Sequence, residues 1–167
     1  MALTDYDAIL GFGSNIGDKV ANLEQAIALL TTSGDVRLVR RSKVYRTAPW
    51  GVTDQDWFAN ACATFKTNLA PRALLERCQS VEGEMHRVRD MRWGPRNIDV
   101  DILAYRNEKI CEPDLVIPHP LIAERAFVLI PLQDVAPDFT LTNRTLDQMI
   151  AAIDVNDVVA ISTESDA

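Results

Sequence analysis

The chain has 167 residues, of which 47% are apolar and 25% are charged, and its formal net charge at pH 7 is −7. This length suits one domain with a buried core, which we expect to span residues 1–160 before a frayed polar tail at 161–167. The acidic balance argues against a general nucleic-acid binder, which needs a broad basic face. No apolar run reaches the roughly 20 residues of a membrane helix, and no basic N-terminal start resembles a secretory signal. We therefore expect a cytoplasmic protein, with a monomer as the default.

The apolar pattern predicts alternating strands and helices in the first half of the chain. Helical spacing is clear where apolar residues recur every three or four positions, and strands are indicated by short apolar or alternating runs. Gly34 closes the first helix, and Pro71 is suited to the start of the second. The predicted order is a strand at 7–12, a helix at 18–31, a strand at 36–47, a loop at 48–56, a strand at 58–67 and a helix at 71–87.

The second half begins with an arginine-rich loop that Gly94 and Pro95 keep from being helical. A strand at 98–105, a turn at 107–108, a short helix at 121–125, an apolar run at 127–132 and a helix at 146–153 follow. The order β-α-β-β-α-β with later additions predicts an α+β, ferredoxin-like fold. We expect an antiparallel sheet with helices packed on it, three layers deep, with C-terminal additions.

Two acidic residues on one strand are the most informative local feature. Asp99 and Asp101 are two positions apart, so both carboxylates point to the same face of the strand. Adjacent carboxylates repel each other unless a cation lies between them, and Mg²⁺ takes one or two carboxylates with water and phosphate oxygens. Taken alone, the pair is equally typical of a solvated strand.

Four arginines precede this pair within a dozen residues and favour a site for magnesium-bound polyphosphate. Guanidinium groups bind phosphate in a bidentate manner, while a metal ion neutralises it from the other side. The alternative reading of this segment is a charged helix end followed by a solvated loop. The arginines are Arg87, Arg89, Arg92 and Arg96, and Trp93 lies among them.

The common nucleotide-binding motifs are absent. Gly11-Phe-Gly-Ser-Asn-Ile-Gly17 does not match G-x-G-x-x-G, and no P-loop pattern occurs. A strand-to-helix turn with positive φ explains these glycines without a ligand. His119, between two prolines, is equally compatible with a phosphate contact and with a structural hydrogen bond.

Taken together, these motifs resemble the hydroxymethyldihydropterin pyrophosphokinases. The resemblance rests on the segment from Arg87 to Ile102, with Trp93-Gly-Pro-Arg96 and Asp99-Val-Asp101 inside it, and extends from Ile9 to Pro137. Further matching segments are Gly13-Ser-Asn15, Tyr45-Arg-Thr-x-Pro49, Asn60-Ala61 and Pro118-His-Pro120 with Arg125 and Phe127. Phe58 departs from the family, in which tyrosine is common there.

The resemblance implies transfer of the β,γ-diphosphate of ATP to the hydroxymethyl oxygen of a reduced pterin, with release of AMP. It implies that Asp99 and Asp101 bind two Mg²⁺ ions and that Arg87 and Arg96 stabilise the transferred group. Gln79, Arg89, Arg92, His119 and Arg125 would contact ATP, with Glu82 close to the metal ions. Thr47, Pro49, Phe58, Asn60, Trp93 and Phe127 would bind the pterin, with Phe58 and Phe127 on either side of its ring.

Two other readings compete with this one. A metal-dependent phosphohydrolase could use the same acids and arginines, and would release phosphate without any pterin. An RNA-binding ferredoxin-like domain would need aromatic residues on its central strands, where this chain has acids instead.

Overall fold

The computed structural model describes residues 5–48, 56–85 and 97–161 and contains a six-stranded sheet in which every pairing is antiparallel. The strand order is β10-β3-β4-β1-β5, and β2 pairs with β4 at the other end of that long strand. The strands are β1 (Ala8–Ser14), β2 (Val36–Arg41), β3 (Tyr45–Thr47), β4 (Phe58–Thr67), β5 (Asp99–Tyr105) and β10 (Val159–Ala160).

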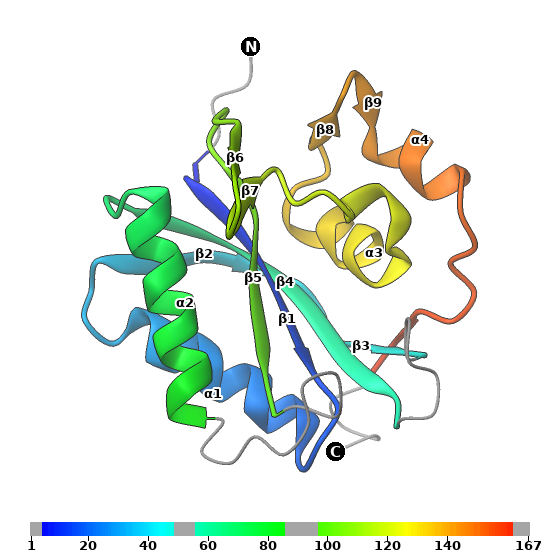
Figure 1. The fold of residues 1–167 in the computed structure, drawn as a ribbon. Coiled ribbons are helices and arrows are strands. Elements are labelled where there is room, and N and C mark those ends of the chain that lie inside the picture. The colour runs from blue at the N-terminus through cyan, green and yellow to red at the C-terminus, as the bar shows by residue number, and fades with distance from the viewer. Residues whose placement is uncertain (1–4, 49–55, 86–96, 162–167) are drawn as a thin grey trace.

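Helices cover both faces of this sheet (Figure 1). Alternate residues of β1 point to opposite faces, so Leu10 and Phe12 join one core while Ile9 joins the other. The first core packs α1 (Lys19–Thr31) and α2 (Pro71–Met85) on the sheet, and the second packs α3 (Ala126–Val135) and α4 (Leu146–Ala151). The predicted antiparallel sheet with helices packed on it is therefore confirmed.

The predicted strand at 36–47 is wrong in one respect, because it is broken into β2 and β3. The break lies at 42–44, where the backbone N–H of Cys62 donates to the side-chain hydroxyl of Ser42 at 2.9 Å. This side-chain bond takes the place of a regular ladder bond, so the pairing with β4 is interrupted there. β2 pairs with the residues from Ala63 onward, and β3 pairs with residues 58–60.

The C-terminal part is richer in short elements than expected. The predicted helix at 121–125 is a 3-10 turn at Ile122–Glu124, and the apolar run at 127–132 belongs to α3. The last helix, predicted at 146–153, ends at Ala151 and starts with a capping box at Thr145. Two hairpins were not predicted: β6 (Ile110–Glu112) with β7 (Leu115–Ile117), and β8 (Thr140–Leu141) with β9 (Arg144–Thr145).

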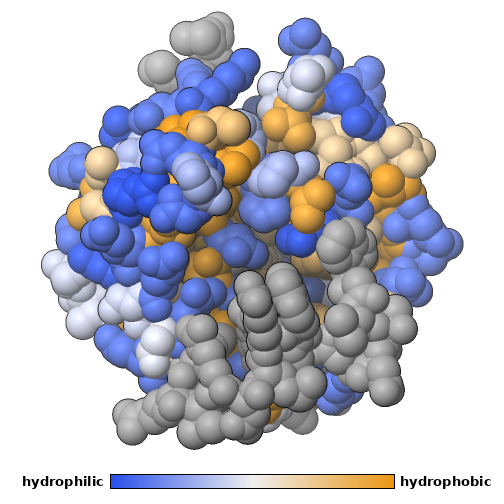
Figure 2. All heavy atoms as spheres, in the orientation of Figure 1, coloured by the Kyte–Doolittle hydropathy of each residue, from blue (hydrophilic) through white to orange (hydrophobic). Residues whose placement is uncertain are grey.

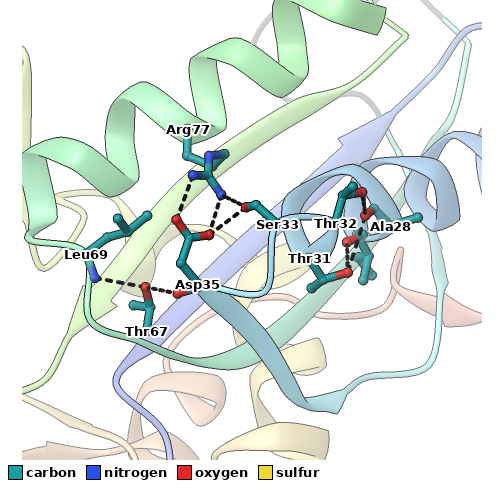
Figure 3. A network of polar contacts seen from close by, with 9 residues as sticks. Ala28, Thr31, Thr32, Ser33, Asp35, Thr67, Leu69 and Arg77 are labelled. Atoms are coloured by element: carbon teal, nitrogen blue, oxygen red, sulfur yellow. Dashed lines mark hydrogen bonds and ion pairs between the residues drawn. The ribbon is translucent and has the colours of Figure 1, made fainter.

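An ion pair fixes α2 against the turn that leads into β2 (Figure 3). The guanidinium group of Arg77 bonds both carboxylate oxygens of Asp35, at 2.8 and 2.9 Å, and also the hydroxyl of Ser33. The Asp35 pKa is held well below its usual range, mainly by the Arg77 hydrogen bonds.

Hydrophilic residues predominate on the described part of the face in Figure 2, with apolar residues exposed in small groups between them. Cys62 and Cys78 are buried, as expected from their apolar surroundings in the sequence. Within the ranges given above, no helix has both the length and the hydropathy needed to cross a membrane.

Candidate active site

The two aspartates lie opposite two glycines of the neighbouring central strand. Asp99 pairs with Gly13 and Asp101 pairs with Gly11 in the β1–β5 ladder. Directly opposed residues share a face, and Phe12 with Val100 belongs to the α1–α2 core, so the aspartates face the α3 side. Asp99 is half-buried and Asp101 is exposed, which leaves both carboxylates within reach of a ligand.

On the other side of β1, Gly13 is also in register with Asn60 of β4. Asn60 is buried, and its amide Nδ2 donates to the hydroxyl of Thr47 at 2.7 Å. Phe58 lies two residues before Asn60 and therefore on the same face, half-buried. With neighbouring strands about 4.8 Å apart, Asp99 and Asn60 lie roughly 10 Å apart across one row of the sheet.

Gly11 and Gly13 of β1 lie between the aspartates of β5 and the Asn60 amide of β4, on the face of the sheet that they share. The sequence interpretation missed this role. Both lie inside β1 with extended backbone, so the predicted need for positive φ holds only at Gly17 (φ 71°). A Cβ on Gly13 would lie 2.8 Å from the Asn60 Oδ1 atom. Gly13 is therefore required for the position of the Asn60 amide. The signal in the sequence was the G-x-G spacing, which matches that of D-x-D.

Residues of α2 approach the open edge of β5. The Glu82 carboxylate accepts the backbone N–H of Val100 at 2.9 Å, between the two aspartates. Burial, with the negative charges of Glu82 and Asp101 nearby, raises the pKa of the Cys78 thiol to about 12. Glu82 thus lies close to the acid pair, and Gln79 is exposed on the same helix.

The segment before α3 brings an arginine close to the acid pair and a histidine next to β5, where the His119 backbone N–H donates to the Leu103 carbonyl at 2.9 Å. The His119 Nδ1 atom accepts the Leu121 backbone N–H at 3.1 Å, which leaves the proton of the neutral ring on Nε2. Burial, assisted by the nearby positive charge of Arg125, lowers the His119 pKa and so favours the neutral ring. Burial also lowers the pKa of Arg125, whereas the negative charges of Asp101 and Asp99 act to raise it. This interaction shows that the Arg125 guanidinium lies near the acid pair. The Arg125 guanidinium carbon is 5.4 Å from the centre of the Phe127 ring.

The structure therefore brings together most of the predicted residues that it describes. Thr47, Phe58 and Asn60 form one end of the candidate site, and Asp99, Asp101, Glu82 and Arg125 form the other. Six predicted residues lie outside the described ranges: Pro49, Arg87, Arg89, Arg92, Trp93 and Arg96.

A second contact missed by the sequence interpretation joins β3 to α3. The Tyr45 hydroxyl donates to the Asp134 carboxylate at 2.7 Å, although the two residues are 89 positions apart. Burial raises the Tyr45 pKa, and the hydrogen bond to Asp134 raises it further. Nothing in the local sequence pattern pairs these residues.

A family model and the sequence relatives of this chain all indicate the same enzyme family. The model of the 7,8-dihydro-6-hydroxymethylpterin-pyrophosphokinase family matches residues 9–137. The 2-amino-4-hydroxy-6-hydroxymethyldihydropteridine pyrophosphokinase of Methylorubrum extorquens is 50% identical over 88% of this chain and 93% of its own length. The proteins of the same name from Bacillus subtilis and Pseudomonas aeruginosa are 44% and 41% identical, over 77% and 86% of this chain and 77% and 89% of theirs.

Solved structures agree on the fold. Wild-type HPPK-DHPS of Plasmodium falciparum superimposes with a TM-score of 0.71 at 15% identity, over 93% of this chain. This chain spans only 47% of that protein, and at such low identity the likeness concerns the fold alone. The sequence relatives and the family model carry the assignment: the chain belongs to the 7,8-dihydro-6-hydroxymethylpterin-pyrophosphokinase family.

Proposed function

We propose that this protein transfers diphosphate from ATP to 6-hydroxymethyl-7,8-dihydropterin in folate biosynthesis. The hydroxymethyl oxygen bonds to the β-phosphorus of ATP, the bond from that phosphorus to the oxygen bridging to the α-phosphate breaks, and AMP leaves. The step also releases the proton of that hydroxyl group. Membership of the family over residues 9–137 is the observation that carries this proposal.

Asp99 and Asp101 are proposed to hold two Mg²⁺ ions on the α3 face of β5. Their donor set fits the ion, because Mg²⁺ favours a few carboxylate oxygens and leaves other positions to water and phosphate. Within the described ranges, no group of three or more histidine, cysteine, aspartate or glutamate side chains is arranged to hold a metal ion. When bound, magnesium neutralises the phosphate oxygens on which negative charge accumulates.

The phosphate end of the site is proposed to include Arg125 and His119 beside the acid pair. The charge on Arg125 suits a phosphate oxygen, and its partial burial strengthens that attraction. The Nε2–H of neutral His119 can donate to a phosphate without adding charge. Arg87, Arg89, Arg92, Arg96 and Gln79 remain predicted contacts of ATP or of the transferred group.

The pterin end is proposed to be Asn60, Thr47, Phe58 and Phe127. Asn60 is buried and held by Thr47, so its amide is preorganised to read the polar edge of a heterocycle. Phe58 and Phe127 are half-buried aromatic residues suited to stacking on the faces of a planar ring. Pro49 and Trp93 remain predicted contacts of the pterin.

Several broader features belong to the same proposal. The strand order β5-β1-β4 followed by β2 and β3 supports a ferredoxin-like core formed by β1, α1, β2–β3, β4, α2 and β5. We infer one domain across residues 1–160, since both cores share this sheet, and a monomer that works in the cytoplasm, where ATP is supplied. On the α3 face, β1 has glycines and β5 has aspartates where an RNA-binding sheet would have aromatics, which disfavours that reading.

The decisive test mixes the protein with ATP, magnesium and 6-hydroxymethyl-7,8-dihydropterin, and measures nucleotides and pterins chromatographically. The proposal requires AMP and pterin diphosphate in equal amounts, and no AMP when the pterin is omitted. Formation of ADP or phosphate irrespective of the pterin would instead support the phosphohydrolase alternative. The Asp101→Asn variant, purified in the same way, is the matched control, because it carries the same contaminating kinases and should form little pterin-dependent AMP.

A further inference from the structure

Hydrogen bonds to one aspartate of α3 connect the two walls proposed to enclose the pterin end of the site. The Tyr45 hydroxyl of β3 donates to the Asp134 Oδ2 atom of α3 at 2.7 Å, and the backbone N–H of Lys43 donates to the same oxygen at 3.1 Å. Tyr45 is only 7% exposed, so its hydroxyl depends on this partner. Because both donors are in or next to β3, Asp134 ties that strand to the helix.

At the β3 end, Tyr45 is directly connected with the residues proposed to read the pterin edge. Tyr45 pairs with Asn60 across the β3–β4 ladder, and Thr47 follows two residues later on the same face. Thr47 in turn accepts the Asn60 amide N–H. A shift of β3 would therefore displace the oxygen that orients this amide.

At the α3 end, Asp134 follows Phe127 by seven residues, or almost two helical turns. Both residues therefore lie on the same side of α3, about 10 Å apart along its axis. Asp134 is in the last turn of α3, where the helix dipole disfavours a carboxylate. Helix stability thus does not explain this residue, whereas the bonds to β3 do.

We propose that the Tyr45–Asp134 contact is a positioning pair that sets the separation between the wall containing Thr47 and Asn60 and the wall containing Phe127, and thereby the affinity for the pterin. The inference rests on the proposed function and assigns two positioning residues to it. Neither side chain is proposed to touch the substrate. We expect the main effect at the pterin end, because the acid pair belongs to β5, which β4 and β1 separate from β3.

The test compares Tyr45→Phe with a matched control, Tyr105→Phe. Each variant removes one hydroxyl from a buried tyrosine, but the Tyr105 hydroxyl bonds the Leu69 carbonyl in the other core. For Tyr45→Phe we expect the KM for the pterin to rise about tenfold, with the KM for ATP and kcat within about twofold of wild type. For Tyr105→Phe we expect a lower melting temperature with both KM values unchanged.

Variants of Asp134 complete a double-mutant cycle. Asp134→Ala removes the Lys43 bond as well as the Tyr45 bond, so it should raise the pterin KM at least as much as Tyr45→Phe does. The double variant should be no worse than Asp134→Ala, since the Tyr45 bond is already lost in that variant. Asp134→Asn retains an oxygen acceptor and should restore most of the affinity. Additive effects, or a pterin KM for Tyr45→Phe no different from that of Tyr105→Phe, would overturn the inference. Absence of AMP formation by the wild-type protein would refute the proposed function itself.

Discussion

A methyl group added at Gly13 should disturb pterin binding more than the same group added at Gly11. The new Cβ at position 13 would lie 2.8 Å from the Asn60 Oδ1 atom, while ordinary contacts start at 3.4 Å, so the two must separate by 3.4 − 2.8, or about 0.6 Å. Asn60 is buried and bonded to Thr47, so the amide can move only by straining that bond or shifting the strand. Overpacking of this kind costs about 1–3 kcal/mol of folding stability.

Steady-state kinetics and thermal melting measure the two consequences separately. For Gly13→Ala we expect the KM for the pterin to rise between about 10- and 100-fold, because a displacement approaching 1 Å can cost that much in binding or rate. Gly11→Ala is the matched control on the same face of the same strand, where the nearest atom to the new Cβ is the flexible Leu103 Cδ1, at 3.4 Å. If both variants change the pterin KM equally, or if Gly13→Ala leaves it unchanged, the steric argument fails.

Three further predictions concern the acid pair, Glu82 beside it, and the ion pair between Arg77 of α2 and Asp35. Asp101→Asn should lower kcat at least about 100-fold with an unchanged melting temperature, because the residue is exposed; near-normal turnover would contradict the metal assignment. Glu82→Ala should lower kcat about tenfold by releasing the Val100 N–H between the aspartates, and Glu82→Gln less, since an amide oxygen still accepts that bond; equal losses would point to a role for the Glu82 charge instead. Arg77 lowers the pKa of Asp35 in the folded protein, so the ion pair stabilises the fold fully at pH values above the Asp35 pKa of the unfolded chain, about 3.9. This contribution to folding stability is lost progressively as the pH falls below that value. The melting temperature of wild type should therefore exceed that of Asp35→Asn at pH 7, and the difference should be smaller at pH 3, where only part of the contribution is lost because the folded pKa lies well below that pH. A difference that stays constant between pH 7 and pH 3 would contradict the assignment.

Local patterns were sufficient to locate α1, α2, β4 and β5. The apolar residues of α1 and α2 recur at helical spacing, and β4 and β5 are short apolar runs between turn residues, so each could be located without the fold. The shared face of Asp99 and Asp101 follows from the two-residue period of any strand. The type of the apolar run at 127–132 could not be decided in this way, because a buried helix and a buried strand have the same composition over so few residues.

Features that depend on distant residues escaped prediction. The break between β2 and β3 is caused by the Cys62 N–H, which bonds Ser42 from 20 residues away. The importance of Gly13 depends on its register with Asn60 and Asp99, each from a strand more than 40 residues away in sequence. The Tyr45–Asp134 contact spans 89 positions. In each case the local sequence is compatible with several outcomes, and tertiary pairing selects one.

The register of the three central strands determines how far apart the two ends of the site lie. Asp99, Gly13 and Asn60 form one row, so the distance from the acids to the amide is two strand spacings, or roughly 10 Å. A slip of one residue in either ladder would turn one of these side chains toward the α1–α2 core, where Ala61 and Val100 now lie. A slip would therefore expose a large apolar surface to water, and the free energy lost in this way keeps the row in register. It follows that substitutions that weaken the α1–α2 core should unfold the protein before they alter the spacing of the site, whereas changes at β3 and α3 can alter pterin affinity in a protein that remains folded.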